Sequence, residues 1–120
     1  MASIFVTGST EGIGRETAAT LVDAGHRVVL HARNHDRAVE VFTRVPGADG
    51  VLVGDLASLA ETRNLADDAR RAGPFDAVIH NAGLGGGGAG RTLSKDGIEQ
   101  IFQINVLAPY LLTALMEQAH

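Results

Sequence analysis

The sequence of 120 residues has no cysteine and no tryptophan, and aromatic residues make up only 4% of it. Without cysteine there is no disulfide framework, no thiolate metal site and no cysteine nucleophile. The five histidines are scattered along the chain, so we expect no metal site. With so few aromatic side chains, the core must consist mainly of Val, Leu, Ile and Ala.

The chain also lacks an excess of basic residues and a long apolar segment. Its formal net charge of −4 argues against a nucleic-acid partner held by electrostatic attraction. No apolar run approaches the roughly 20 residues that cross a bilayer, and the N-terminus does not resemble a signal peptide. We therefore expect a soluble, cytoplasmic protein with no membrane partner, folded as one domain over residues 1–120.

Short apolar runs alternate with helical patterns along the chain. Each predicted strand is an apolar or β-branched run; these strands cover residues 3–7, 27–32, 50–55 and 75–81. The predicted helices follow them over about 12–24, 34–44, 58–71 and from 94 onward. Helices supply the long crossovers that parallel strands need. The pattern predicts a Rossmann-like α/β fold, a doubly wound parallel sheet with strand order 3-2-1-4.

Local signals support these helices. Four residues of the first predicted helix fall on one stripe: Ile13, Thr17, Leu21 and Ala24. Asn34 is the expected N-cap of the second helix. Ser58 and Glu61 fit the capping box at the start of the third.

Three glycines follow the first strand in the segment TGSTEGIG, residues 7–14. Gly8 lets the chain leave the strand sharply, while Gly12 and Gly14 remove side chains where a phosphate or the strand must approach. The free amides at the start of the next helix favour an anion here. We predict a diphosphate site formed by Gly8, Ser9, Thr10, Glu11, Gly12, Ile13 and Gly14. The alternative is a tight turn with three permissive residues.

The glycine spacing is T-G-x-x-x-G-x-G, and with three further motifs it resembles the classical short-chain dehydrogenases/reductases. The further motifs are Asp55-Leu56, HNAG at 80–83 (His in place of the first Asn) and INV at 104–106. Residues 93–113 further resemble the retinol dehydrogenase and protochlorophyllide reductase-like branch. The resemblance covers the whole chain but only the amino-terminal half of a typical member, so the fold is expected to be truncated relative to the family.

The resemblance implies the rest of a nicotinamide cofactor site. It places the adenine near Asp55 and Leu56, and the nicotinamide-side ribose near Asn81, Ala82 and Gly83. The second strand ends in Arg33-Asn34, with no carboxylate until Asp36. A guanidinium suits a 2′-phosphate, so we predict that Arg33 and Asn34 bind the cofactor and that NADP(H) is preferred over NAD(H). The alternative is that Arg33 is a solvated surface residue.

Asn105 is the predicted catalytic residue. Pro109, four residues later, lacks the N–H that would bond the Asn105 carbonyl, and a free buried carbonyl takes a water. The resemblance implies that this water belongs to the family's proton relay. The alternative is an ordinary proline kink with a capping asparagine.

In the family, a tyrosine hydroxyl gives or takes the proton during hydride transfer, and a lysine four residues later lowers the tyrosine's pKa. This sequence has no tyrosine and lysine at that spacing. The only tyrosine is Tyr110 and the only lysine is Lys95. We therefore predict part of a longer NADP(H)-dependent oxidoreductase acting on a small carbonyl or alcohol substrate, compatible with a homo-oligomer. The alternative is a non-catalytic nucleotide-binding module complete at 120 residues. The loop over 84–90 is either a mobile lid or a simple connection.

Overall fold

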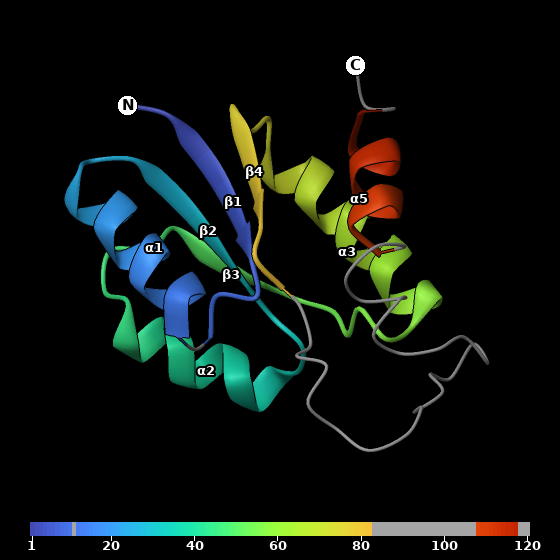
Figure 1. Cartoon of the computed structure of the whole chain (residues 1–120), viewed down its shortest axis with the longest axis horizontal. Helices are drawn as coiled ribbons and strands as arrows, with labels where there is room; N and C mark the ends of the chain where they lie inside the picture. Colours follow the sequence, from blue (N-terminus) through green and yellow to red (C-terminus); the bar gives the residue numbers. More distant parts are fainter. Residues whose placement is uncertain (11, 83–107, 118–120) are drawn as a thin grey trace.

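The computed structural model describes residues 1–10, 12–82 and 108–117. Within them, the strands are β1 (Ser3–Thr7), β2 (Arg27–Ala32), β3 (Gly50–Val53) and β4 (Ala77–His80). The helices are α1 (Gly12–Asp23), α2 (His35–Arg44), α3 (Leu59–Ala72) and α5 (Ala108–Glu117). The strands form a parallel sheet in the order β3-β2-β1-β4 (Figure 1), which confirms the predicted topology.

Strand β1 is the centre of the sheet. It pairs with β2, Ser3 opposite Arg27, and with β4, where Ile4 lies opposite Ala77. Because every pair is parallel, the carboxyl ends of the strands lie along one edge of the sheet. Thr7 and His80, the last residues of β1 and β4, are direct partners at that edge. The loops that follow these strands are therefore brought together there.

The sheet separates two hydrophobic clusters. Phe5 packs with Leu65 of α3 and Leu112 of α5. Its neighbours on β1 point the other way, and Val6 packs with Ala18 of α1 and Val41 of α2. Figure 1 shows α1 and α2 on one side of the sheet and α3 and α5 on the other. This alternation of side chains along a strand gives the doubly wound arrangement.

The stripe predicted for the first helix is only partly its buried face: Leu21 packs against the second cluster. The buried residues of α1 are Gly14 and Ala18, whereas Ile13 is 75% exposed and Ala24 is also exposed. At the start of the helix, Gly14 lies close to the Gly8 carbonyl and the Asn81 side chain. The residues of α1 that face the sheet thus include Gly14 and Ala18.

Side-chain caps begin two of the helices. Asn34 Oδ1 accepts a 2.9 Å hydrogen bond from Arg37 N at the start of α2, as predicted. Ser58 Oγ accepts one of 3.2 Å from Glu61 N at the start of α3. The Glu61 carboxylate accepts a hydrogen bond from Asp55 N. This bond connects the first turn of α3 to the loop that precedes the helix.

Strands β3 and β4 are shorter than predicted, ending at Val53 and His80. Beyond β3, the Asp55 side chain accepts from Ala57 N in a local turn, which competes with continued strand pairing. Beyond β4, the backbone N–H of Asn81 bonds to the Ile79 carbonyl instead of continuing the strand. The predicted helix start at Ser94 lies outside the described residues. No helix among those described combines the length and the apolar character of a membrane span.

Candidate cofactor site

The chain leaves β1 through Gly8, which has a φ of 64°. This left-handed conformation disfavours any residue with a side chain. A Cβ at Gly8 would also lie only 2.5 Å from Ala82 Cα. The first glycine is therefore required both by the turn and by the close approach of the chain after β4.

The other two glycines of the loop have different roles. A Cβ at Gly14 would collide with the Gly8 carbonyl oxygen and with the side-chain amide nitrogen of Asn81. Gly12 has a φ of 55°, and apart from its chain neighbours no described residue lies within 4 Å of the position its Cβ would occupy. Gly14 thus lets α1 pack against the strand corner, whereas Gly12 leaves the beginning of α1 open.

The loop after β1 and the end of β4 form one hydrogen-bonded unit. The buried Thr7 hydroxyl accepts hydrogen bonds from the backbone N–H groups of Asn81, at 3.1 Å, and Ala82, at 3.2 Å. The Asn81 side chain donates to the Gly8 carbonyl oxygen at 3.2 Å. The structure thus brings together the threonine and glycine of the first motif with the asparagine and alanine of the third.

Ser9 is fully buried and bonds to β2. Its hydroxyl accepts a 2.8 Å hydrogen bond from His31 N and donates one of 3.1 Å to His31 O. The Ser9 side chain is therefore occupied within the protein. Ile13, by contrast, is 75% exposed near the open Gly12.

Arg33 follows the last residue of β2 and is exposed. Among the residues that the structure describes, its guanidinium has no ion pair or hydrogen bond. Asn34 comes next, and its side-chain Oδ1 caps α2 by accepting from Arg37 N. The carboxyl end of β2 therefore presents an unpaired cation at the edge where the glycine loop lies.

The end of β3 continues into Asp55 and Leu56. Asp55 Oδ1 accepts a 2.9 Å hydrogen bond from Ala57 N, which makes a tight turn. Leu56 is 4% exposed and packs in the same cluster as Phe5 and Leu65. The Leu56 side chain thus belongs to the core, and the Asp55 carboxylate is the more accessible of the two.

A buried histidine at the carboxyl edge was not among the predicted site residues. His31 is 3% exposed; its Nδ1 lies 2.9 Å from Gly8 N and its Nε2 lies 2.7 Å from Gly54 O. Burial lowers the pKa of His31 below its ordinary value of 6.5, despite opposing effects of the Gly54 bond and the Asp55 charge. The signal in the sequence was an ionisable residue inside the apolar run RVVLHA.

Three predicted site residues, Glu11, Gly83 and Asn105, lie outside the described residues, as does the loop over 84–90. Pro109 lies in the first turn of α5. Tyr110 is 73% exposed on this helix. Across the described part of the chain, no three His, Asp or Glu side chains gather closely enough to share a metal ion.

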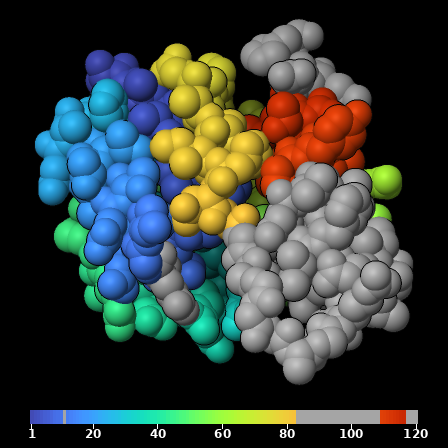
Figure 2. Space-filling view, in the orientation of Figure 1, coloured from blue at the N-terminus to red at the C-terminus, as the bar shows by residue number. Residues whose placement is uncertain are grey.

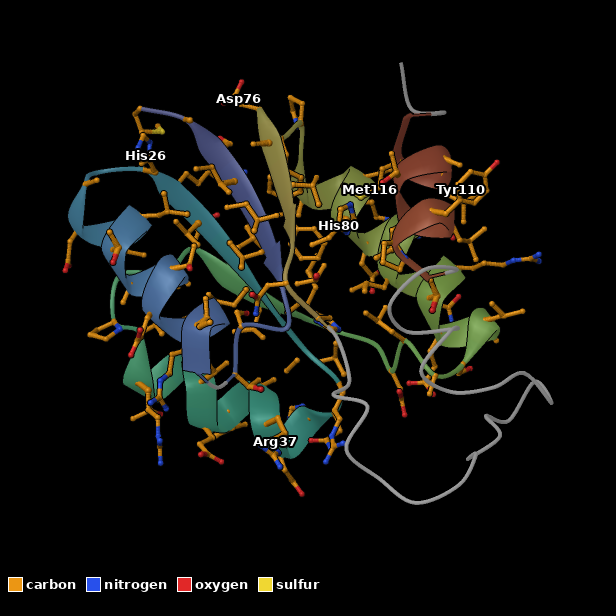
Figure 3. The ribbon with its side chains drawn as sticks, viewed as in Figure 1. His26, Arg37, Asp76, His80, Tyr110 and Met116 are labelled. Carbon is orange, nitrogen blue, oxygen red and sulfur yellow. The ribbon has the colours of Figure 1, made fainter. Side chains whose placement is uncertain are left out.

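A separate hollow lies between α3, β4 and α5, and Figure 2 shows its position beside β4. Its lining includes Pro74, Val78, His80 and Met116. His80 Nε2 lies 3.1 Å from Thr113 Oγ1 of α5, and Figure 3 shows His80 and Met116 near this gap. Partial burial lowers the pKa of His80.

Residues 2–119 match the family model for the short chain dehydrogenases. The chain belongs to this family. Among its relatives, an uncharacterized oxidoreductase of Emericella nidulans is 54% identical over 119 residues, which is 98% of this chain and 47% of that protein. Mouse retinol dehydrogenase 14 is 34% identical over 130 aligned residues, 95% of this chain and 38% of that protein. The resemblance to the family and to its retinol dehydrogenase branch is confirmed.

A solved short-chain dehydrogenase from Sphingobium yanoikuyae, in complex with NADPH, has the same fold. It superimposes with a TM-score of 0.76 at 27% identity, covering 97% of this chain and 47% of that one. The chain thus spans about half the length of the short-chain dehydrogenases it matches. The family is one of oxidoreductases. In this chain, the loop with Gly8 and Gly12 forms the first strand-to-helix turn of the fold.

Proposed function

We propose that this chain is the nucleotide-binding part of an NADP(H)-dependent oxidoreductase that acts on a small carbonyl or alcohol compound. The observation that carries the cofactor preference is Arg33, which is exposed at the carboxyl end of β2 and makes no ion pair with any described residue. No carboxylate precedes Asp36 in this segment to bind a ribose 2′-hydroxyl. The NADPH in the solved Sphingobium yanoikuyae relative is consistent with this preference.

The residues present fit a dinucleotide. The diphosphate would lie over the loop from Gly8 to Gly14, where Gly12 leaves open space and the start of α1 presents free amides. The 2′-phosphate would meet Arg33, with Asn34 beside it. The adenine would lie near Asp55 and Leu56.

The remaining assignments concern the reacting end of the site. The nicotinamide-side ribose would contact Asn81, Ala82 and Gly83, and Asn105 would hold the water of the proton relay. A bound nicotinamide supplies hydride transfer to or from a carbonyl carbon. The chain's own contribution is to bind and orient: Asn81 holds the Gly8 carbonyl, and Arg33 supplies a positive charge.

Calorimetric titration of the protein with NADPH and with NADH tests this proposal. We expect NADPH to bind at least about tenfold more tightly, the effect of one charge-assisted hydrogen bond. Equal affinities would overturn the role of Arg33, and binding of neither nucleotide would overturn the proposed function. Oxidation of NADPH by a panel of aldehydes and ketones, measured with the whole protein of which we propose this chain is a part, then tests the reaction class.

A further inference from the structure

The ring of His31 has one tautomer that satisfies both of its contacts. Gly8 N–H can only donate, so Nδ1, 2.9 Å away, must be the bare acceptor nitrogen. The Gly54 carbonyl can only accept, so Nε2, 2.7 Å away, must carry the proton. The ring is therefore neutral and acts as a bridge between the loop after β1 and the loop after β3.

The same residue is also held through its backbone. Ser9 Oγ bonds to both His31 N and His31 O, and Ser9 N donates to His31 O at 3.3 Å. Any substitution at position 31 keeps these backbone groups. Only the ring contacts, one to Gly8 and one to Gly54, depend on the side chain.

The ring contact orients the first of the two peptide groups that flank the Gly8 Cα. His31 Nδ1 holds its N–H, and the Asn81 side chain holds its carbonyl oxygen at 3.2 Å. The two peptide groups around a residue with φ of 64° are thus oriented by side chains from β2 and from the end of β4. A loop fixed before its ligand arrives loses less conformational entropy on binding.

We propose that His31 is a positioning residue that preorganises the diphosphate loop by accepting the Gly8 N–H. The inference rests on the proposed nucleotide-binding function. His31 does not touch the diphosphate itself, because its ring is buried behind the loop. Its effect on the cofactor is transmitted through the orientation of Gly8.

Two amide variants separate the ring's contacts. His31→Asn puts an amide oxygen close to the position of Nδ1 and keeps an acceptor for Gly8 N–H. His31→Gln puts an amide nitrogen close to the position of Nε2, so it keeps the donor for Gly54 O but leaves the Gly8 N–H without an acceptor. Both replace the ring by an uncharged amide, and they differ by one methylene, so thermal unfolding of each variant reports the difference in packing separately from nucleotide affinity.

The measurements are NADPH affinity by calorimetry and exchange of the Gly8 amide proton by NMR in the absence of nucleotide. We expect His31→Asn to bind NADPH within about threefold of wild type and His31→Gln to bind about tenfold more weakly. The Gly8 amide should exchange faster in the Gln variant only. Thermal unfolding of each variant confirms that the compared samples are folded.

His26→Gln is the matched control. His26 Nδ1 also accepts a backbone N–H, from Ala2 at 3.0 Å, but it lies just before β2, at the opposite end of the strand (Figure 3). This variant should bind NADPH as wild type does. Equal affinity in both His31 variants, whether retained or reduced, would overturn the inference and assign the ring a structural role.

A failure of the proposed function would give a different experimental result from a failure of the positioning role. If wild type binds neither NADPH nor NADH, the cofactor assignment is wrong and the inference about its loop fails with it. If wild type binds NADPH but the Gly8 amide stays protected in His31→Gln, the cofactor assignment stands and the positioning role is wrong.

Discussion

Asn81, just after β4, donates its side-chain amide to the carbonyl oxygen of Gly8, just after β1, at 3.2 Å. The two residues lie 73 positions apart in the sequence. The contact therefore makes the shape of the glycine loop depend on the pairing of β1 with β4. Gly14 packs directly beneath this contact, since an added Cβ would meet both partners.

Gly14→Ala should destabilise the protein and abolish nucleotide binding. The new methyl group would collide with the Gly8 carbonyl and the Asn81 amide, and backbone atoms at a packed corner cannot move aside cheaply. We expect a loss of about 2 kcal/mol or more in the free energy of unfolding. Urea denaturation and NADPH titration measure the two effects.

Gly50→Ala is the control for this substitution. Gly50 begins β3, its φ is not positive, and within the described part of the chain, its sequence neighbours aside, nothing lies within 4 Å of the position of an added Cβ. We expect a change in unfolding free energy within about 0.5 kcal/mol and unchanged NADPH binding. A tolerated Gly14→Ala would contradict the packing described for the corner.

Arg33→Ala should weaken NADPH binding by roughly 1.5–3 kcal/mol, the value of a hydrogen bond to a charged group. NADH binding should not change, because NADH lacks the 2′-phosphate. Arg44→Ala is the control: Arg44 pairs with Glu40 at the last turn of α2, about 13 Å along the helix from its start. Calorimetric titrations of wild type, Arg33→Ala and Arg44→Ala with NADPH and with NADH test this prediction. An equal loss of NADH and NADPH affinity in Arg33→Ala would argue against selective recognition of the 2′-phosphate.

Arg27→Ala should destabilise the fold without touching the nucleotide site. The Arg27 guanidinium bonds to Asp49 at 2.9 Å and to the Ala72 carbonyl at 2.7 Å, and it lies 5.5 Å from the centre of the Phe75 ring. Losing these contacts should cost about 1–2 kcal/mol of unfolding free energy.

Arg71→Ala provides the comparison for Arg27. Arg71 pairs with Asp68 on α3, but its side chain is 76% exposed, and such surface pairs contribute about 0.5 kcal/mol or less. Urea denaturation curves of the two variants should therefore differ clearly. Similar losses would show that the contacts of Arg27 contribute no more than a surface pair.

His31 should make the fold less stable in acid. Its pKa is lowered in the folded state by burial, against the attraction of the nearby Asp55 charge. The unfolded chain therefore binds the proton more readily, and acid favours unfolding. The stability contribution of the neutral ring is complete above the ordinary pKa of 6.5 and is lost as the pH falls through the lower folded-state value.

Urea denaturation at several values between about pH 8 and pH 5 tests this in wild type and in His31→Asn. His80, whose pKa burial also lowers, contributes with the same sign. The difference between the two curves, rather than the wild-type curve, isolates His31. Parallel curves for the two proteins would contradict the expected titration.

The order of the strands and the corner at Gly8 and Gly14 were predictable because they follow from local patterns. Apolar runs separated by helical segments permit few topologies, and glycine spacing reports directly on the backbone. The cap of α2 by Asn34 was predictable for the same reason.

What the sequence could not show depends on contacts between distant segments. Ile13 is exposed although it lies on the apolar stripe, because α1 packs through Gly14 and Ala18 instead, and Gly14 lies against Asn81, which is far away in the sequence. The role of His31 requires that Gly8 and Gly54 lie on either side of its ring. Neither partner adjoins His31 in the sequence, so the histidine in an apolar strand indicated a buried ionisable residue but not the groups that its ring contacts.

The division of the interior by the sheet has a consequence for how this chain can change in evolution. Phe5 and Val6 are adjacent in the chain, but the first contacts the layer of α3 and α5 and the second the layer of α1 and α2. A compensating substitution for a smaller residue at Phe5 must come from its own layer, for example at Leu65, since the backbone of the sheet blocks access from the other. Core substitutions can therefore accumulate independently in the two layers, which are separated by β1 and share only its backbone.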